Sequence, residues 1–285
     1  METLSSEAYL RKHHLSVYLN DAVNHLVSSQ VDNPADCLLD YLSGVLVGNH
    51  VLNRDFAYVS ATPYNRRALL NVTKDVLQSM SEAGPMTMAD CHNMLRMVCP
   101  DFPLGPIKNA WNTALAIHID SSDTVWEPSQ QAHQAARLPF SAFFSCLEIT
   151  FSYERYLMDL RKKFFDASKR CIKFSELKRE ICDASKREEV SGWPVPPITS
   201  LEAAVLEASS FGKQTGFEFR KLVVALSCHK DLRNALEEEE KKLRTRSNRH
   251  NHANPSNKGH NGKNEEDRQV ETPRNRKKGT RGKTH

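Results

Sequence analysis

Side chains that could bind a metal ion or catalyse a reaction are scattered along this 285-residue chain. Cys91 and His92 are adjacent, but successive residues of a helix point about 100° apart and cannot converge on one ion. The seven cysteines include no Cys-x-x-Cys pair and mostly lie in apolar helical stripes. They predict reduced thiols in the cytoplasm rather than a zinc site or a disulfide framework.

Sequence motifs of catalysis are also missing. No nucleophile elbow, HExxH motif or dinucleotide-binding fingerprint is present, and the acidic runs 188–189 and 237–240 are typical of solvated faces. The residues therefore nominate no catalytic site, no metal site and no cofactor, and we expect a protein that is not an enzyme. An enzyme whose site is assembled from distant residues is the rival interpretation.

Calcium is the one ion that a weak repeat suggests. Segments 86–91, 138–143 and 217–222 share apolar residues at their first, third and sixth positions. The second half of an EF-hand has this pattern, in which a short β-contact leads into the exiting helix. The repeat therefore predicts EF-hand-like helix pairs.

The ligand positions of these EF-hand-like loops do not suit calcium. The ion needs oxygen ligands at positions one, three and five and a bidentate glutamate at position twelve. Position twelve is Asp90 in the first candidate loop, Ala142 in the second and Lys221 in the third. We expect degenerate pairs that bind no metal, and a calcium sensor remains the alternative.

Two short amphipathic helices between residues 6 and 46 give the strongest structural signal. Asn33 offers an N-cap oxygen and Pro34 takes the first position of the second helix. A hairpin this short is marginal alone, so its apolar stripes must pack on a second copy, another chain or the rest of this protein. We predict partner docking by nine residues: Tyr9, Leu10, Leu15, Leu19, Ala22, Leu26, Leu38, Leu39 and Leu42.

Strand signals are almost absent, which predicts an all-α fold. We expect a helical hairpin at 1–50, a helical body at 51–182, a Pro/Gly linker at 183–199 and C-terminal helices at 200–246. Within the body, 51–60 reads as a connector that is briefly extended, and 139–168 reads as one long helix. No apolar run of 18 residues is present, so we expect no transmembrane helix.

Residues 247–285 are predicted to form a disordered basic tail. Residues 241–285 hold 14 Lys and Arg against 4 Asp and Glu, whereas the first 240 residues hold 25 against 31. The tail is either a solubilising segment, a nuclear localisation signal or a weak contact for an acidic polymer such as tubulin's tails. Without aromatic residues it is not expected to read a nucleic-acid sequence. The acidic-polymer contact would use Arg274, Arg276, Lys277, Lys278, Arg281 and Lys283.

The N-terminal hairpin resembles the dimerisation/docking hairpin of type II regulatory subunits of cAMP-dependent kinase. The resemblance is carried by Tyr9-Leu10, Leu15, Leu19, Asn33-Pro34 and Leu38-Leu39. It implies a hairpin that pairs with another hairpin and receives an amphipathic helix. An adaptor for kinase anchoring or axonemal assembly is therefore one candidate function.

A second resemblance covers more of the chain. Asp21-Ala-Val23, Gly48-Asn-His50, Arg54-Asp-Phe56, Ala61-Thr-Pro-Tyr-Asn-Arg66 and Cys99-Pro-Asp-Phe-Pro-Leu104 are similar to the centriolar satellite-associated regulators of the tubulin polyglutamylase complex. This resemblance implies a non-catalytic regulatory or scaffold component, with ligase activity in a different, ATP-grasp subunit. It implies partners among the complex subunits and centriolar satellite proteins, and a location at satellites, centrosome and cilia.

Overall fold

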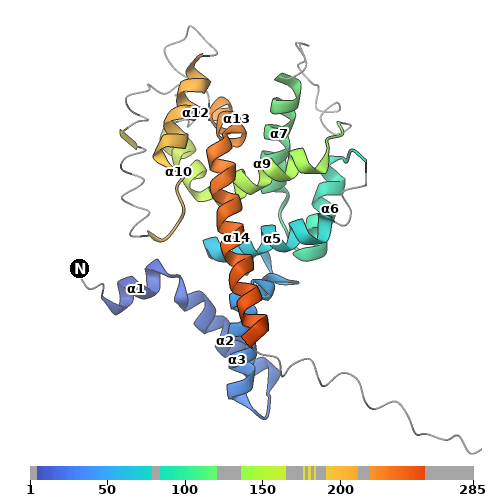
Figure 1. The fold of residues 1–285 in the computed structure, drawn as a ribbon, viewed down its shortest axis with the longest axis vertical. Coiled ribbons are helices and arrows are strands. Elements are labelled where there is room, and N and C mark those ends of the chain that lie inside the picture. The colour runs from blue at the N-terminus through green and yellow to red at the C-terminus, as the bar shows by residue number, and fades with distance from the viewer. Residues whose placement is uncertain are drawn as a thin grey trace, which may run out of the picture.

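The computed structural model describes residues 5–78, 84–120, 136–164, 176, 179–180, 183, 191–210 and 219–253. Regular structure in these residues is helical apart from one isolated β-bridge, so the predicted all-α class is confirmed. The described helices form an elongated molecule with the N-terminal hairpin at one end (Figure 1). None of them is both long enough and apolar enough to cross a bilayer.

The hairpin is formed by the second and third helices. The N-terminal elements are α1 (Ser6–Lys12), α2 (Leu15–Ser29), α3 (Pro34–Val47), η1 (Asn49–Val51) and α4 (Phe56–Ser60). Asn33 Oδ1 accepts hydrogen bonds from the backbone N–H of Ala35 at 3.2 Å and of Asp36 at 3.4 Å, so the N-cap is present. The stretch before it is two helices rather than one, because His14 has a left-handed backbone (φ 53°) that separates α1 from α2.

The body contains two successive pairs of helices. They are α5 (Pro63–Gln78) with α6 (Met88–Val98) and α7 (Leu104–Asp120) with α9 (Phe140–Ser152), followed by α10 (Glu154–Phe164). Their connections meet at a bridge in which Met86 and Leu138 exchange backbone hydrogen bonds of 2.8 and 2.9 Å. These two residues are the first positions of two aligned repeat segments. The bridge supports the EF-hand-like arrangement, which stays a prediction.

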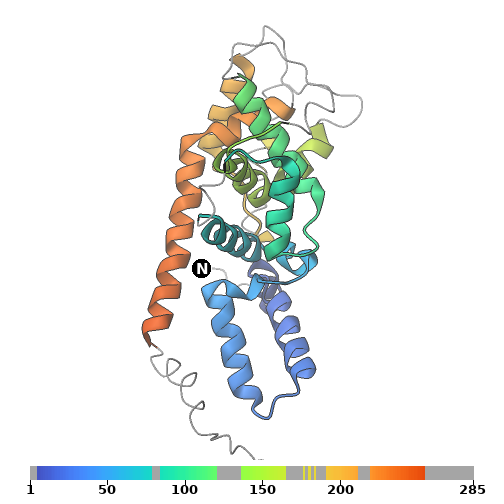
Figure 2. The same cartoon turned by 90° about the vertical axis from the view of Figure 1, so that its right-hand side faces the viewer.

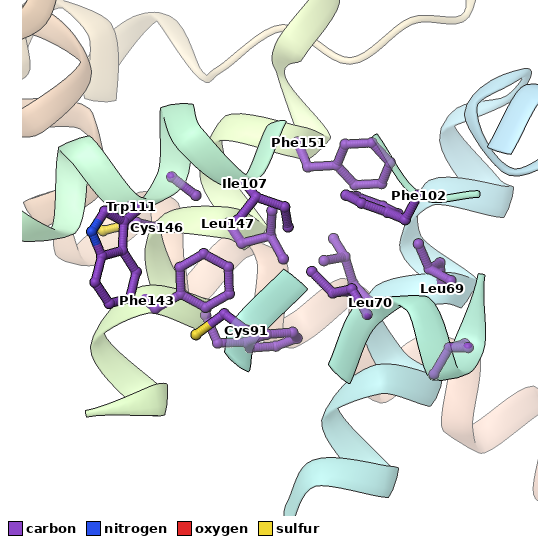
Figure 3. Packing of buried hydrophobic residues seen from close by; sticks show 14 of the residues in the cluster. Leu69, Leu70, Cys91, Phe102, Ile107, Trp111, Phe143, Cys146, Leu147 and Phe151 are labelled. Carbon is purple, nitrogen blue, oxygen red and sulfur yellow. The ribbon is translucent and has the colours of Figure 1, made fainter. Parts of the chain in front are cut away.

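Helix α9 lies at the centre of the packing, as its apolar composition predicts. Phe143, Leu147 and Phe151 point into the first of two core clusters, where Trp111 and Ile107 are also buried (Figure 3). Each such side chain contributes about 1.5–3 kcal/mol when fully buried. Ile149, from the same helix, belongs to the second cluster, so α9 connects both cores.

The C-terminal helices build the second cluster and then return to the hairpin. They are α12 (Ile198–Ser210), α13 (Phe219–Cys228) and α14 (Lys230–Ala253). α14 is anchored by the buried Leu232, passes α5 and reaches α3 on the side away from α2 (Figure 2). It ends at Ala253, so its last seven residues, 247–253, belong to the segment predicted as the tail.

Two local expectations were wrong. The helix expected over 139–168 is interrupted at Tyr153, whose backbone (φ −104°, ψ 14°) leaves the helical region before α10 begins. The interruption redirects the chain so that Tyr153, Tyr156 and Leu157 pack in the second cluster. The connector expected over 51–60 is wrong for its second half: Leu52 and Asp55 have extended backbones, but Phe56–Ser60 form the short helix α4.

Candidate docking surface

The nine predicted docking residues do not share one environment. Leu19, Leu39 and Leu42 expose 55%, 56% and 47% of their surface, and Tyr9 is also exposed. Ala22 is buried, and the other four (Leu10, Leu15, Leu26 and Leu38) are half-buried. Packing within this protein therefore covers some of the nine predicted docking residues and leaves the others exposed.

The uncovered part gives the hairpin an exposed apolar stripe on each of its two helices, and the two stripes together are here named the exposed face. It consists of Leu19, Val23 and Val27 on α2 and Leu39, Leu42 and Leu46 on α3, each at least 47% exposed. Spacings of four on α2 and of three and four on α3 place each triplet on one side of its helix. The predicted docking set omitted Val23, Val27 and Leu46, although the spacing from Leu19 and Leu42 signals them.

The opposite side of the hairpin is held to the body by polar side chains. The Tyr18 hydroxyl lies 2.8 Å from Thr62 Oγ1 and donates to Asn65 Oδ1 at 2.9 Å. The Tyr41 hydroxyl donates to Asp21 Oδ2 within the hairpin at 2.7 Å and lies 3.2 Å from the hydroxyl of Tyr58 on α4. Since these residues face α4 and α5, the exposed face points away from the body.

An ion pair lies at the centre of this hairpin–body junction. Arg54 pairs with Asp21, and its guanidinium lies 4.2 Å from the ring centroid of Tyr58. His50 Nε2 lies 2.8 Å from Asn65 Oδ1, and burial lowers the pKa of His50. Burial also raises the pKa of Tyr41, so the junction is neutral near pH 7 apart from the Arg54–Asp21 pair.

Residues that carry the resemblance to the polyglutamylase regulators lie at this junction. Asp21, His50, Arg54 and Asn65 all come from the matching motifs. Their contacts orient the hairpin on the body and do not reach the exposed face. The motifs that carry the resemblance therefore position the hairpin, and with it the exposed face.

A second polar centre forms around Arg66. Its guanidinium donates to the Phe151 carbonyl at 2.9 Å and pairs with Glu154 at 2.9 Å. It also lies 5.1 Å from the ring centroid of Trp193, whose other close cation is Arg155 at 4.9 Å. The segment predicted as a linker thus places an aromatic ring close to two guanidinium groups.

Gly192 brings this segment against the break between α1 and α2. An added Cβ would lie 2.1 Å from the Lys12 carbonyl oxygen, and the backbone of Gly192 is left-handed (φ 68°). The Trp193 ring meets the His14 ring edge-on with a centroid separation of 5.4 Å, and burial lowers the pKa of His14. Only glycine allows so close an approach of the two backbones.

The described residues offer no candidate metal centre. Within them, no group of three or more His, Cys, Asp or Glu side chains is placed to hold an ion. The Asp90 carboxylate, at position twelve of the first candidate loop, instead accepts from the Thr87 backbone N–H at 2.9 Å and from its hydroxyl at 2.7 Å. It completes a capping box at the start of α6.

The predicted acidic-polymer contacts, from Arg274 to Lys283, lie outside the described residues. The same holds for residues 79–83, 131–135 and 211–218, which are parts of the three candidate EF-hand loops.

Comparison with known proteins finds relatives that carry a single name. Over 169 residues the chain is 28% identical to the "Centriolar satellite-associated tubulin polyglutamylase complex regulator 1" of Danio rerio, covering 57% of this chain and 46% of that protein. The proteins of that name from Mus musculus and Homo sapiens are 29% identical over 154 residues, covering 52% of this chain and 42% of each relative. The chain thus spans less than half the length of the curated relatives it matches.

Other comparisons add no match. No protein-family model and no solved structure matches the chain. Relatives from fish to human nevertheless confirm that this chain resembles the centriolar satellite-associated regulators of the tubulin polyglutamylase complex.

Proposed function

We propose that this chain is a non-catalytic regulatory component of the tubulin polyglutamylase complex that docks on other subunits through the exposed face. Its work would be at centriolar satellites, the centrosome and the base of cilia. The names of the relatives support an association with the polyglutamylase complex and with centriolar satellites. The absence of catalytic motifs from the sequence supports a non-catalytic role.

The observation that carries the docking proposal is a concentration of exposed apolar surface. Seven of the fifteen exposed large hydrophobic side chains in the described part of the chain lie between Leu19 and Leu46. Apolar side chains exposed in such a concentration are typical of a surface that binds something.

The energy available from this surface is sufficient for a contact within a complex. Each half-exposed leucine or valine would contribute about 1 kcal/mol on complete burial, and six of them about 6 kcal/mol. Association of two proteins costs several kcal/mol in lost translational and rotational freedom. The exposed face would therefore contribute to binding a subunit, and further contacts from the body would be needed for a stable association.

Affinity purification from ciliated cells tests the proposal. Leu39→Asp combined with Leu42→Asp would place two charges in the docked surface, and we expect loss of the polyglutamylase subunits from the purified material. Met97→Asp is the matched control, since Met97 is 65% exposed on α6, away from the hairpin. Leu38 is a poorer choice because it is half-buried within the hairpin.

Unchanged recovery of the subunits with the double variant would contradict the proposal. Recovery of kinase-anchoring or axonemal proteins by the parent chain, without ligase subunits, would favour the adaptor function instead. Circular dichroism of both variants establishes that each is folded before the comparison is made.

The basic tail would add a weak contact between this chain and the acidic tails of tubulin. Its attraction would act over about 8–10 Å at physiological ionic strength and would weaken in higher salt. Truncation after Ala253 should lower microtubule co-sedimentation without releasing the complex subunits.

A further inference from the structure

Helix α14 crosses the body with few apolar contacts. Near its start Leu232 is buried and Leu236 is half-buried against the second cluster. Beyond Leu236 every side chain that the structure describes is polar, namely those of 237–242 and Thr245. The helix nevertheless continues to Ala253 and contacts α3 (Figure 2). Its middle is therefore attached to the body by polar side chains rather than by an apolar stripe.

Two ion pairs with α5 make this attachment. Glu239 pairs with Arg67, and the Glu240 carboxylate lies 2.7 Å from Lys74 Nζ. Arg67 and Lys74 are seven residues apart, so they lie on one side of α5, two turns from each other. The Lys74–Glu240 pair is partly shielded from water, because the Glu240 side chain is only 15% exposed.

A third carboxylate approaches Lys74 from α9. Glu148 Oε1 is 3.9 Å from Lys74 Nζ. The charged groups that face Glu148 are Lys74 on α5 and Arg233, Glu237 and Glu240 on α14. One lysine is thus shared by carboxylates of two different helices. Burial raises the pKa of Glu148 to about 7, and the two acidic neighbours on α14 act in the same direction.

We propose that α14 is a pH-sensitive strap: ionisation of Glu148 loosens its attachment to the body and, with it, the support that α14 gives to α3. While Glu148 is protonated, Lys74 attracts the carboxylates of α14 without competition from α9. Once Glu148 is ionised, it competes for the lysine and repels Glu237 and Glu240. Separation of α14 from the body relieves this repulsion and admits water to Glu148, so the open arrangement favours the ionised form.

Linkage gives the direction and the size of the effect. Burial under the attached strap raises the pKa of Glu148 from its ordinary value of 4.5 to about 7, and opening restores the ordinary value. The attached arrangement is therefore most favoured at low pH and loses stability as the pH rises from 4.5 to about 7. Between about pH 6 and about pH 8, the ratio of open to attached α14 should rise about tenfold.

Hydrogen exchange of the full chain at these two pH values tests the proposal. Measured rates are corrected for the intrinsic pH dependence of amide exchange, and amides of α7, which is buried in the first cluster, report global opening. We expect protection of the α14 amides beyond Glu237 to fall about tenfold more than that of α7, and protection of α3 to fall with it. An equal change in α14 and α7 would overturn the proposal. A loss confined to α14 would overturn the support of α3.

Substitution separates Glu148 from the histidines, which also titrate in this range. Glu148→Gln keeps the size of the side chain without its charge, so α14 should be as protected at the higher pH as at the lower. Asp159→Asn, an exposed change on α10, is the matched control and should keep the pH dependence of the parent. The parent's pH dependence in Glu148→Gln, or its loss in Asp159→Asn, would overturn the proposal.

Removal of the shared lysine tests the geometry independently of pH. Lys74→Gln takes away the cation that Glu240 meets, so α14 should already be less protected at the lower pH, with α7 unchanged. Protection of α14 equal to that of the parent at the lower pH would show that the lysine does not hold the strap, and would overturn the proposal.

Discussion

Replacement of Arg66 by methionine tests how the body holds together beneath the hairpin. Arg66 is 8% exposed, and its guanidinium also donates from Nε to the Ser60 carbonyl at 3.2 Å. Methionine would fill much of the volume and remove every polar contact. It would leave the Phe151 carbonyl and the Glu154 carboxylate without this donor.

The structure gives the size of the effect. Breaking a buried ion pair by removing one partner costs about 3–5 kcal/mol. Glu154 keeps 26% of its side chain in water, which places the expected loss at the lower end, about 3 kcal/mol. Burial lowers the pKa of Arg66, so its charge depends on these partners for compensation.

Urea unfolding followed by circular dichroism measures the loss. Arg67→Met is the matched control one residue along α5, because Arg67 pairs with the more exposed Glu239 and should lose less than about 1 kcal/mol. Equal unfolding free energies of the two variants would refute the reasoning that the Arg66 centre is a main contact between α5, α9 and α10.

Four further predictions concern buried or crowded groups and the candidate calcium sites. Burial raises the pKa of Glu148 to about 7, so the folded state keeps a proton that the unfolded state releases as pH rises above about 4.5. The free energy of unfolding of the parent should therefore fall between pH 5 and 7. In urea unfolding, Glu148→Gln should be as stable as the parent at pH 5 and about 2 kcal/mol more stable at pH 8. The same pH dependence of unfolding free energy in both proteins would contradict this. Burial also raises the pKa of Cys91 to about 12, so native alkylation at pH 8 should modify the exposed Cys228 and spare Cys91, as mass spectrometry would show. Gly192→Ala should cost more than about 2 kcal/mol of unfolding free energy through its clash with Lys12 and its left-handed backbone, and an unchanged midpoint would contradict the close approach. Calcium titration followed by calorimetry should give no binding heat, because lysine, alanine and a capping aspartate occupy the position of the strongest ligand.

Local sequence signals predicted much of the helical framework. The predicted Asn33 cap is present because the side chain acts within one turn of its own helix, and the Thr87 capping box has the same local origin. The apolar spacing of the hairpin also indicated which residues lie on a stripe. It did not show which half of that stripe the body covers.

The junction could not be predicted because its contacts join distant residues. Tyr18 meets Asn65, and Arg66 meets Phe151 and Trp193, across separations that no local pattern reveals. The packing of Trp193 was missed for the same reason, since glycine and prolines around it are typical of a linker. The break at Tyr153 follows from tertiary packing in the second cluster rather than from a proline or glycine in α9.

Hydrogen exchange of the chain, alone and within the purified polyglutamylase complex, tests the central claim most directly. Amides of α2 and α3 should exchange markedly more slowly in the complex, while those of α9, buried in both core clusters, should be equally protected in both samples. Equal protection of the hairpin in the isolated monomer and in the complex would contradict docking through the exposed face.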